Sequence, residues 1–185
     1  MKILILETSS EKGCLVLAED GNPIAVKTLP GGPELSKCLA SEVAKLKCKA
    51  ALDLVAVGTG PGSYTGIRVG VALAKALAYG WNVPLLGFCS LKAFAREMAV
   101  LVDARMGGFY ALIDQKPALL APDDPSLQTL SHIASPHPEL IKKRLRTSAI
   151  WQETEPNPEF LAELVYKQFL NEGAAPFELT YLSCP

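Results

Sequence analysis

Two short polar stretches, each following an apolar run, carry the residue types that could do chemistry. In the first, Glu7, Thr8 and Ser9 follow the run from Ile3 to Leu6. They offer a carboxylate and two hydroxyls that could orient a metal ion, a water or a phosphate. Hydroxyl-rich turns also serve purely structural roles, so this pattern alone leaves both interpretations open.

The second stretch is the glycine-rich segment GTGPGSYTG, residues 58–66. It lies between a predicted strand and a predicted helix, where backbone amides and a helix N-terminus favour an anion. The candidate phosphate contacts here are Gly60, Gly62 and Ser63. The segment lacks the Gly-Lys-Ser/Thr ending of a Walker loop, and its glycines do not have dinucleotide-site spacing. The alternative is a tight turn in which Ser63 or Thr65 caps the helix.

The helix predicted after this segment, over residues 66–79, has its smallest residues on one side. They recur at every fourth position and are Gly66, Gly70, Ala74 and Ala78. Another backbone can approach such a strip closely, and Ile67 and Val71 supply a second apolar side. The strip could pack on the internal sheet or could meet another subunit.

Hydrophobic period and turn residues predict the elements that position these stretches. Strands are expected over residues 2–6, 13–18, 24–29, 54–57, 84–88, 100–104 and 109–113. Helices are expected over residues 35–46, 66–79 and 90–98, the last capped by Ser90, and from residue 157 or 158 to Gly173. Residues 117–138 show no clear period and are predicted to be a lobe boundary or a trimmed region.

Composition excludes several classes of protein. With 185 residues, 49% of them hydrophobic, the chain can bury a core in one or two domains and is not disordered. Eighteen Lys and Arg balance nineteen Asp and Glu, so no chain-wide basic field exists to bind nucleic acid. No apolar run reaches the roughly 20 residues of a membrane helix, and the start lacks the features of a secretory signal. We therefore expect a soluble, cytoplasmic protein that has no membrane partner.

The sequence predicts neither a metal site nor a nucleophile of its own. The five cysteines form no C-x-x-C pair, and His132 and His137 have no accompanying ligand set. No Ser/His/Asp or Cys/His arrangement can be assembled. Asp103 and Arg105 are two residues apart on one face of a strand end, where they can form an ion pair or present a charged group to a cleft. Of the two, we expect the structural ion pair.

Three segments, ILILETSS, GPGSYTGIRVGVALAKALA and VDARMGGFYA, occur in that order within residues 1–113. In order and spacing they resemble the bacterial TsaB (YeaZ) family. The resemblance implies an α/β protein with the actin-like ATPase fold of sugar kinases and heat-shock-protein ATPases. It also implies two lobes, residues 1–99 and a reduced second lobe over residues 100–185.

The resemblance further implies a role in making N6-threonylcarbamoyladenosine at position 37 of tRNA. A member of this family is a non-catalytic companion of a TsaD-like subunit, which carries the metal and the active site, and a TsaE-like ATPase joins the pair. The chain would then meet tRNA only through the complex. It would have no cofactor alone, while a nucleotide in the complex and a homodimer when free stay open.

The paired helices of the first lobe are the surface that TsaD grips in this family. The expected partner-interface residues are Leu35, Leu39, Val43, Gly66, Ile67, Gly70, Val71, Ala74 and Ala78.

Three departures from the family pattern bear on the ligand site. Glu7 stands where the family commonly has Asp, a His near Pro33 is missing, and residues 180–183 read TYLS where the family ends a Pro-x-Tyr-Leu-Arg pattern. The alternative to the companion role is a small ATP-dependent phospho- or carbamoyl-transferase that uses Glu7, Ser9 and the 58–66 loop. A peptidase would need a nucleophile and a base, which the sequence does not offer.

Overall fold

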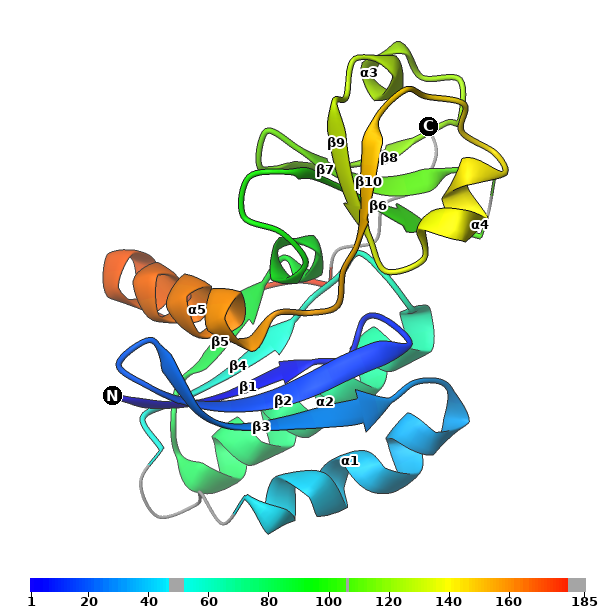
Figure 1. The fold of residues 1–185 in the computed structure, drawn as a ribbon. Coiled ribbons are helices and arrows are strands. Elements are labelled where there is room, and N and C mark those ends of the chain that lie inside the picture. The colour runs from blue at the N-terminus through cyan, green and yellow to red at the C-terminus, as the bar shows by residue number, and fades with distance from the viewer. Residues whose placement is uncertain (47–51, 106, 180–185) are drawn as a thin grey trace.

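The computed structural model describes residues 1–46, 52–105 and 107–179, which form two lobes stacked one above the other (Figure 1). The first lobe contains a five-stranded sheet in the order β3-β2-β1-β4-β5. Its strands are β1 Lys2–Glu7, β2 Lys12–Glu19, β3 Asn22–Pro30, β4 Leu54–Gly58 and β5 Leu85–Phe88. The second sheet has the order β10-β9-β6-β7-β8. Its strands are β6 Ala99–Asp103, β7 Phe109–Ile113, β8 Lys116–Leu120, β9 His132–Ser135 and β10 Ile150–Glu153.

The two sheets are built in the same way. In each, three successive strands pair antiparallel, and the fourth and fifth strands join in parallel on the other side of the first. One helix precedes the fourth strand and another precedes the fifth. In the first lobe these are α1 Pro33–Lys45 and α2 Tyr64–Trp81, of 13 and 18 residues. Their counterparts, α3 Pro125–Gln128 and α4 Pro138–Lys142, have only 4 and 5 residues, so the second lobe is reduced in its helices.

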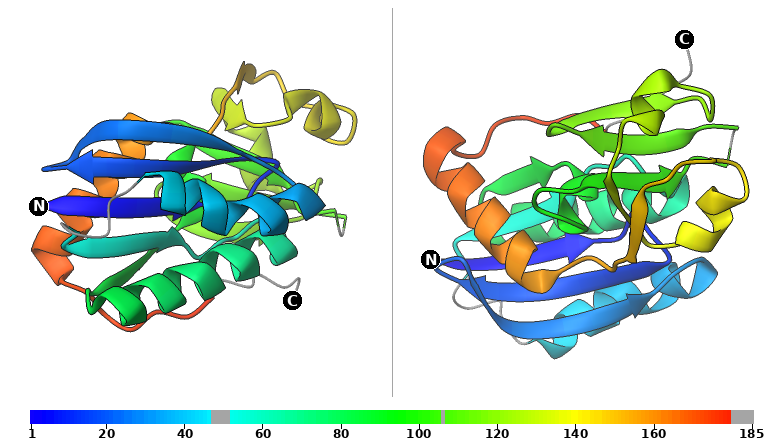
Figure 2. Two further views of the ribbon diagram at one scale, coloured as in Figure 1. Left: turned by 90° about the horizontal axis from the view of Figure 1, so that it is seen from below. Right: turned by 45° about the horizontal axis from the view of Figure 1, so that its top comes forward.

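Helices α1 and α2 run side by side on the face of the first sheet that is turned away from the second lobe (Figure 2). Their apolar residues lie at helical spacing and pack on the sheet in one core cluster. All nine expected partner-interface residues are buried there: Leu35, Leu39, Val43, Gly66, Ile67, Gly70, Val71, Ala74 and Ala78. In this structure the chain's own sheet and turns cover these residues, so only the exposed sides of the same two helices face outward.

The small-residue strip of α2 meets the chain's own turn after β1. A side-chain carbon added at Gly66 would overlap the Thr8 carbonyl oxygen, and one added at Gly70 would overlap Thr8 Oγ1. Thr8 Oγ1 also donates a hydrogen bond to the Gly66 carbonyl, at 2.9 Å. Of the two alternatives for the strip, internal packing is the one the structure adopts.

Helix α5, Pro158–Glu172, covers the other face of the first sheet and lies between the lobes (Figure 2). It begins as predicted, with Asn157 Oδ1 accepting from the N–H groups of Glu159 and Phe160, and it ends at Gly173. Its Leu161 lies in one buried cluster with Ile3 and Ile5 of the first sheet and with Val100 and Leu112 of the second. One core therefore joins the lobes, and the predicted second lobe of residues 100–185 is corrected, because the chain returns to the first sheet at α5.

Two further expectations are wrong. Residues 90–98 form only a short 3₁₀ helix, η2 Ser90–Ala93. Ser90 is buried and its Oγ accepts from the Gly60 N–H, so it does not cap a longer helix. Residues 117–138 are not a lobe boundary, because they contribute β8, α3 and β9 to the second lobe. Within the described ranges, no helix has the length and apolar character needed to cross a membrane.

The packing of α2 predicts opposite effects for two glycine substitutions in the same helix. Gly70→Leu should lower the free energy of unfolding by about 1–3 kcal/mol or more, because the side chain would be forced into Thr8. Gly80→Ala is the control, because a side chain there meets nothing within 4 Å. It should leave stability unchanged or raise it by up to about 1 kcal/mol, since alanine favours a helix. Urea unfolding measures both, and an unchanged Gly70→Leu midpoint would contradict the packing described.

Candidate functional site

A cleft of about 440 Å³ opens between the lobes at the point where the two sequence-predicted stretches meet. The first lobe lines it with the turn between β1 and β2 and with the start of α2. The second lobe lines it with the end of β6, with Tyr110 and with the approach to α4. Its lining residues are Ser9, Ser10, Glu11, Gly62, Ser63, Tyr64, Thr65, Val102, Asp103, Ala104, Arg105, Tyr110, Pro136, His137 and Leu140.

Glu7 lies behind this cleft and does not line it. The side chain is fully buried, and Oε1 accepts a hydrogen bond from the Ser9 N–H at 2.6 Å. The second oxygen, Oε2, has no hydrogen-bond partner among the described residues. It fits because Gly58 has no side chain, since a carbon there would overlap both Oε2 and Ser90 Oγ. Burial raises the pKa of the Glu7 carboxyl, and hydrogen bonds from Ser9 oppose part of that shift.

The glycine-rich loop directs most of its hydrogen-bonding groups back into the protein. The Thr59 N–H donates to the Phe88 carbonyl, and the Gly60 N–H donates to Ser90 Oγ. The Ser63 N–H donates to the Ser9 carbonyl at 2.6 Å. Ser63 Oγ accepts from the Gly66 N–H at 3.3 Å, so Ser63 caps α2 as the alternative interpretation of the loop predicted. A phosphate cradle needs such amides aimed at the ligand, and here four of them already have partners in the chain.

The six candidate ligand residues therefore separate into two groups. Ser9, Gly62 and Ser63 line the cleft. Glu7 and Thr8 are buried and lie outside its lining, as does Gly60. The second group cannot contact a ligand in the cleft and instead holds β1, β4 and α2 together.

Ion pairs across the cleft involve residues that sequence patterns did not single out as partners. Glu11 of the first lobe pairs with Arg105 Nη2 at 3.2 Å and lies 3.7 Å from His137 Nε2. Asp103 pairs with Arg144 Nη1 at 2.6 Å and accepts from the Arg105 backbone N–H at 3.0 Å. The expected pair between the Asp103 and Arg105 side chains is thus replaced by two others. Glu11 and Arg144 lie far from their partners in sequence, so no local spacing could reveal these contacts.

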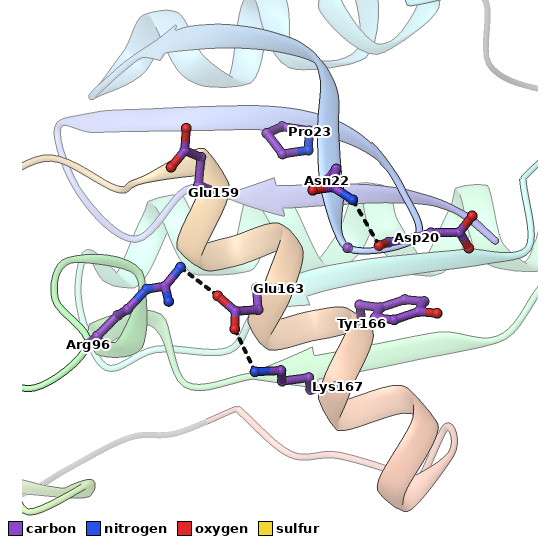
Figure 3. A pocket seen from close by; sticks show the side chains of 9 residues that line it. Asp20, Asn22, Pro23, Arg96, Glu159, Glu163, Tyr166 and Lys167 are labelled. Carbon is purple, nitrogen blue, oxygen red and sulfur yellow. Dashed lines mark hydrogen bonds and ion pairs between the residues drawn. The ribbon is translucent and has the colours of Figure 1, made fainter.

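A second hollow of about 430 Å³ lies between the β2–β3 turn and α5 (Figure 3). Glu163 sits between Arg96 and Lys167 and pairs with both at 2.5 Å. Glu163 thus shares one negative charge between two cations, and none of the sequence-predicted site residues lines this hollow. Within the residues that the structure describes, no group of three or more His, Cys, Asp and Glu side chains is arranged to hold a metal ion.

Comparison with known proteins finds similar chains. The family model for TsaD, tRNA N6-adenosine threonylcarbamoyltransferase, matches residues 34–121. The tRNA threonylcarbamoyladenosine biosynthesis protein TsaB of Escherichia coli is 29% identical over 123 residues, which cover 60% of this chain and 53% of that protein. TsaB of Haemophilus influenzae is 31% identical over 126 residues, covering 60% and 52%. The chain therefore spans about half the length of these curated relatives.

A solved structure extends the likeness over the whole fold. A Pseudomonas aeruginosa protein with similarity to peptidase YeaZ superposes with a TM-score of 0.78 and 22% sequence identity. The superposition covers 98% of this chain and 99% of that one. The two-lobed, actin-like fold expected from the sequence is confirmed. The resemblance carried by the three opening segments is confirmed as well, and the chain is a relative of the bacterial TsaB (YeaZ) proteins.

Proposed function

We propose that this chain is a non-catalytic assembly subunit that binds and supports a TsaD-like catalytic partner in making N6-threonylcarbamoyladenosine in tRNA. The kinship with proteins named for this biosynthesis supports the pathway. The observation that carries the non-catalytic part is that the turn after β1 and the glycine-rich loop direct their hydrogen-bonding groups into the chain. Glu7, the carboxylate that the sequence singled out, is buried behind the turn, and four loop amides are engaged within the chain. The carboxylates that do line the cleft, Glu11 and Asp103, are each paired with an arginine. A TsaE-like ATPase, and a nucleotide held between subunits, belong to the same proposal.

The join between the lobes supports assembly rather than turnover. Enzymes that enclose a ligand between two domains open and close about a hinge. Here Val100 and Leu112 of the second sheet share a fully packed core with Ile3 and Ile5 of the first. Opening the cleft widely would expose this apolar core to water at considerable cost. A shared core of this kind favours lobes that keep one arrangement and present a surface.

The surface proposed for the partner is the α2 outer face, defined by Tyr64, Arg68, Ala72, Ala76 and Tyr79. These residues are exposed, and Tyr79 is 91% exposed. On the neighbouring α1 the exposed side carries Glu–Lys pairs instead. An apolar centre with a charged rim is the usual anatomy of a protein interface.

The match to the TsaD family model supports the identity of the partner. That match, residues 34–121, includes α2 and nearly all of α1. A TsaD-like chain is thus expected to present related helices, and related surfaces can pair about a pseudo-two-fold axis. The same reasoning gives a homodimer through this face when the partner is missing.

Substitutions on the α2 outer face should separate binding from folding. The double change Ala72→Arg and Ala76→Arg should abolish the complex with the TsaD-like subunit of the same organism, because two buried charges would lack partners. The variant should stay folded, since both positions face solvent in the free chain. Light scattering on a sizing column measures the assembly. Ala121→Arg, at an exposed position in the second lobe, is the control. A one-to-one complex unaffected by the double change would exclude this face.

The second candidate, a small ATP-dependent phospho- or carbamoyl-transferase, rests on the hydroxyls of Ser9, Ser10 and Ser63 in the cleft. It needs an ionised carboxylate near those hydroxyls to orient a metal ion or a water. Glu7 is the family-position carboxylate, and its burial disfavours the charged form. The state of Glu7 therefore discriminates between the two candidates.

The stability of Glu7→Gln should depend on pH in a defined direction. The folded-state pKa of Glu7 is raised, so its contribution is complete below the ordinary carboxyl pKa of about 4.3 and is lost as pH rises through the folded-state value. Glutamine keeps the acceptor for Ser9 without ionising. The variant should match the natural chain near pH 4 and become the more stable of the two towards neutral pH in urea unfolding. A variant that is destabilised at neutral pH, with the difference shrinking as the pH falls towards 4, would indicate an ionised, partnered Glu7 and favour the enzyme.

The isolated chain should bind tRNA only weakly at physiological salt. Its net charge is −1, so little of the phosphate-driven attraction available to a basic protein exists. Fluorescence anisotropy with labelled tRNA should give a dissociation constant weaker than about 10 µM at 150 mM salt, within the non-specific range. Tight binding by the free chain would contradict the view that tRNA is held chiefly through the complex.

A further inference from the structure

The cations of the second lobe gather at the edge of the cleft. The sequence KKRLR, residues 142–146, places four cations in five positions where α4 ends, and only Leu145 among them is buried. Arg105 joins them from the end of β6, because Asp103 bonds both its backbone N–H and the Arg144 guanidinium. We call Arg105 and residues 142–146 the second-lobe rim.

The rim carries positive charge that the chain itself does not neutralise. Lys142 pairs with Glu139, Arg144 with Asp103 and Arg105 with Glu11. Lys143 and Arg146 are exposed, and within the described residues neither has a carboxylate within 4 Å. Elsewhere most described lysines and arginines are paired, as Lys12, Lys27 and Arg96 are. Lys143 and Arg146 thus place two unpaired cations three residues apart, beside the paired cations of the same segment.

Two of the rim's arginines are held by carboxylates of this chain. The Arg144 guanidinium lies 4.9 Å from the Phe109 ring centroid and is fixed by Asp103. Arg105 has an 81% exposed side chain, and its partner Glu11 is 63% exposed. Such a surface pair contributes only about 0–1 kcal/mol, so a phosphate can replace Glu11 at little cost. Arginine also suits phosphate geometry better than lysine does.

Beside the rim, the cleft offers groups that suit a nucleoside more than an acidic peptide. Leu140 of α4 and Tyr64 at the start of α2 line the same cleft, and the two helix ends face one another on one side of the molecule (Figure 1). Tyr110 and Thr65 lie in the same lining, while the Tyr64 ring already carries the Arg68 guanidinium at 3.7 Å and belongs to the α2 outer face. Aromatic rings that can stack on bases, with hydroxyls that can reach a ribose, are typical of RNA contacts.

We propose that the second-lobe rim binds the phosphate backbone of RNA, so that this chain holds part of the tRNA in the complex. The identity of the RNA rests on the proposed function, while the rim itself rests on the charges above. Contact with a few phosphates gives low affinity for the free chain. In the complex, the rim's contacts with tRNA add to those of the TsaD-like subunit, because the rim then binds a tRNA that is already held by the same complex.

The test reverses the two unpaired charges, as Lys143→Glu with Arg146→Glu, in the complex with the TsaD-like subunit. Unmodified tRNA is titrated by fluorescence anisotropy between 50 and 200 mM salt. The dissociation constant should rise by about tenfold or more at 100 mM salt. The slope of log affinity against log salt should become shallower by about 2, because each lost phosphate contact removes about 1. The control, Lys92→Glu with Lys116→Glu, changes the net charge equally at sites away from the rim and should stay within about twofold.

The outcomes distinguish the rim from the proposed function. If the complex forms on a sizing column but tRNA affinity and salt slope equal those of the control, the rim proposal is overturned and the assembly role stands. If the natural chain forms no complex, the assembly role is contradicted. The rim is then tested by measuring tRNA binding of the free chain and its variants at 50 mM salt. Rim-dependent tRNA binding there supports the proposal, and rim-independent binding overturns it. Rim-dependent binding to phosphatidylserine vesicles but not to tRNA also overturns it, in favour of a membrane surface.

Discussion

The contact between Thr8 and helix α2 is the constraint on which the rest of the first lobe depends. Thr8 ends the run from β1, and its hydroxyl and carbonyl press against Gly66 and Gly70. Only residues without side chains allow the helix to come this close to the turn. The contact sets the position of Ser63 at the start of α2, and hence the floor of the cleft. It also turns the apolar strip inward, which leaves the opposite side of the helix to face solvent.

A second constraint acts between the lobes. Glu7 fills the space above Gly58, and the hydroxyl of Ser90 ties η2 to the glycine-rich loop. Residues from η2, α5 and both sheets then meet in one core. A ligand site here would need a mobile, solvated carboxylate, whereas the Glu7 side chain is packed inside the protein. In this structure Glu7 and the amides of Thr59 and Gly60 therefore take part in packing and hydrogen bonds within the chain.

Local signals in the sequence account for much of this architecture. The period of Leu35, Leu39 and Val43 predicted α1, and Asn157 with Gly173 marked the two ends of α5. The helix predicted over residues 90–98 does not form. Residues such as Leu91 and Phe94 are apolar because they are buried in the core, and their spacing resembles that of a helix. The short connection to β6 leaves room only for the 3₁₀ helix.

The candidate site was only partly predictable from sequence. Ser9, Gly62 and Ser63 were found because they sit at strand and helix ends. Whether Glu7 pointed into the cleft or behind it depended on Gly58 and Ser90, which lie 51 and 83 positions away. The pairing of Glu11 with Arg105 likewise spans 94 positions. Contacts between residues so far apart in the sequence form only when the lobes are folded, so no local sequence pattern predicts them.

The repeated topology of the two lobes has a consequence for the way in which such a chain can assemble. Two full copies of the unit would offer two long-helix faces, and a molecule with two distinct docking faces can extend head to tail without limit. Because the helices of the second copy are only 4 and 5 residues long, one such face remains. Under the proposed assembly through α2, a body with a single docking face closes into a pair and stops, so the shortened helices of the second lobe would limit the assembly to two chains.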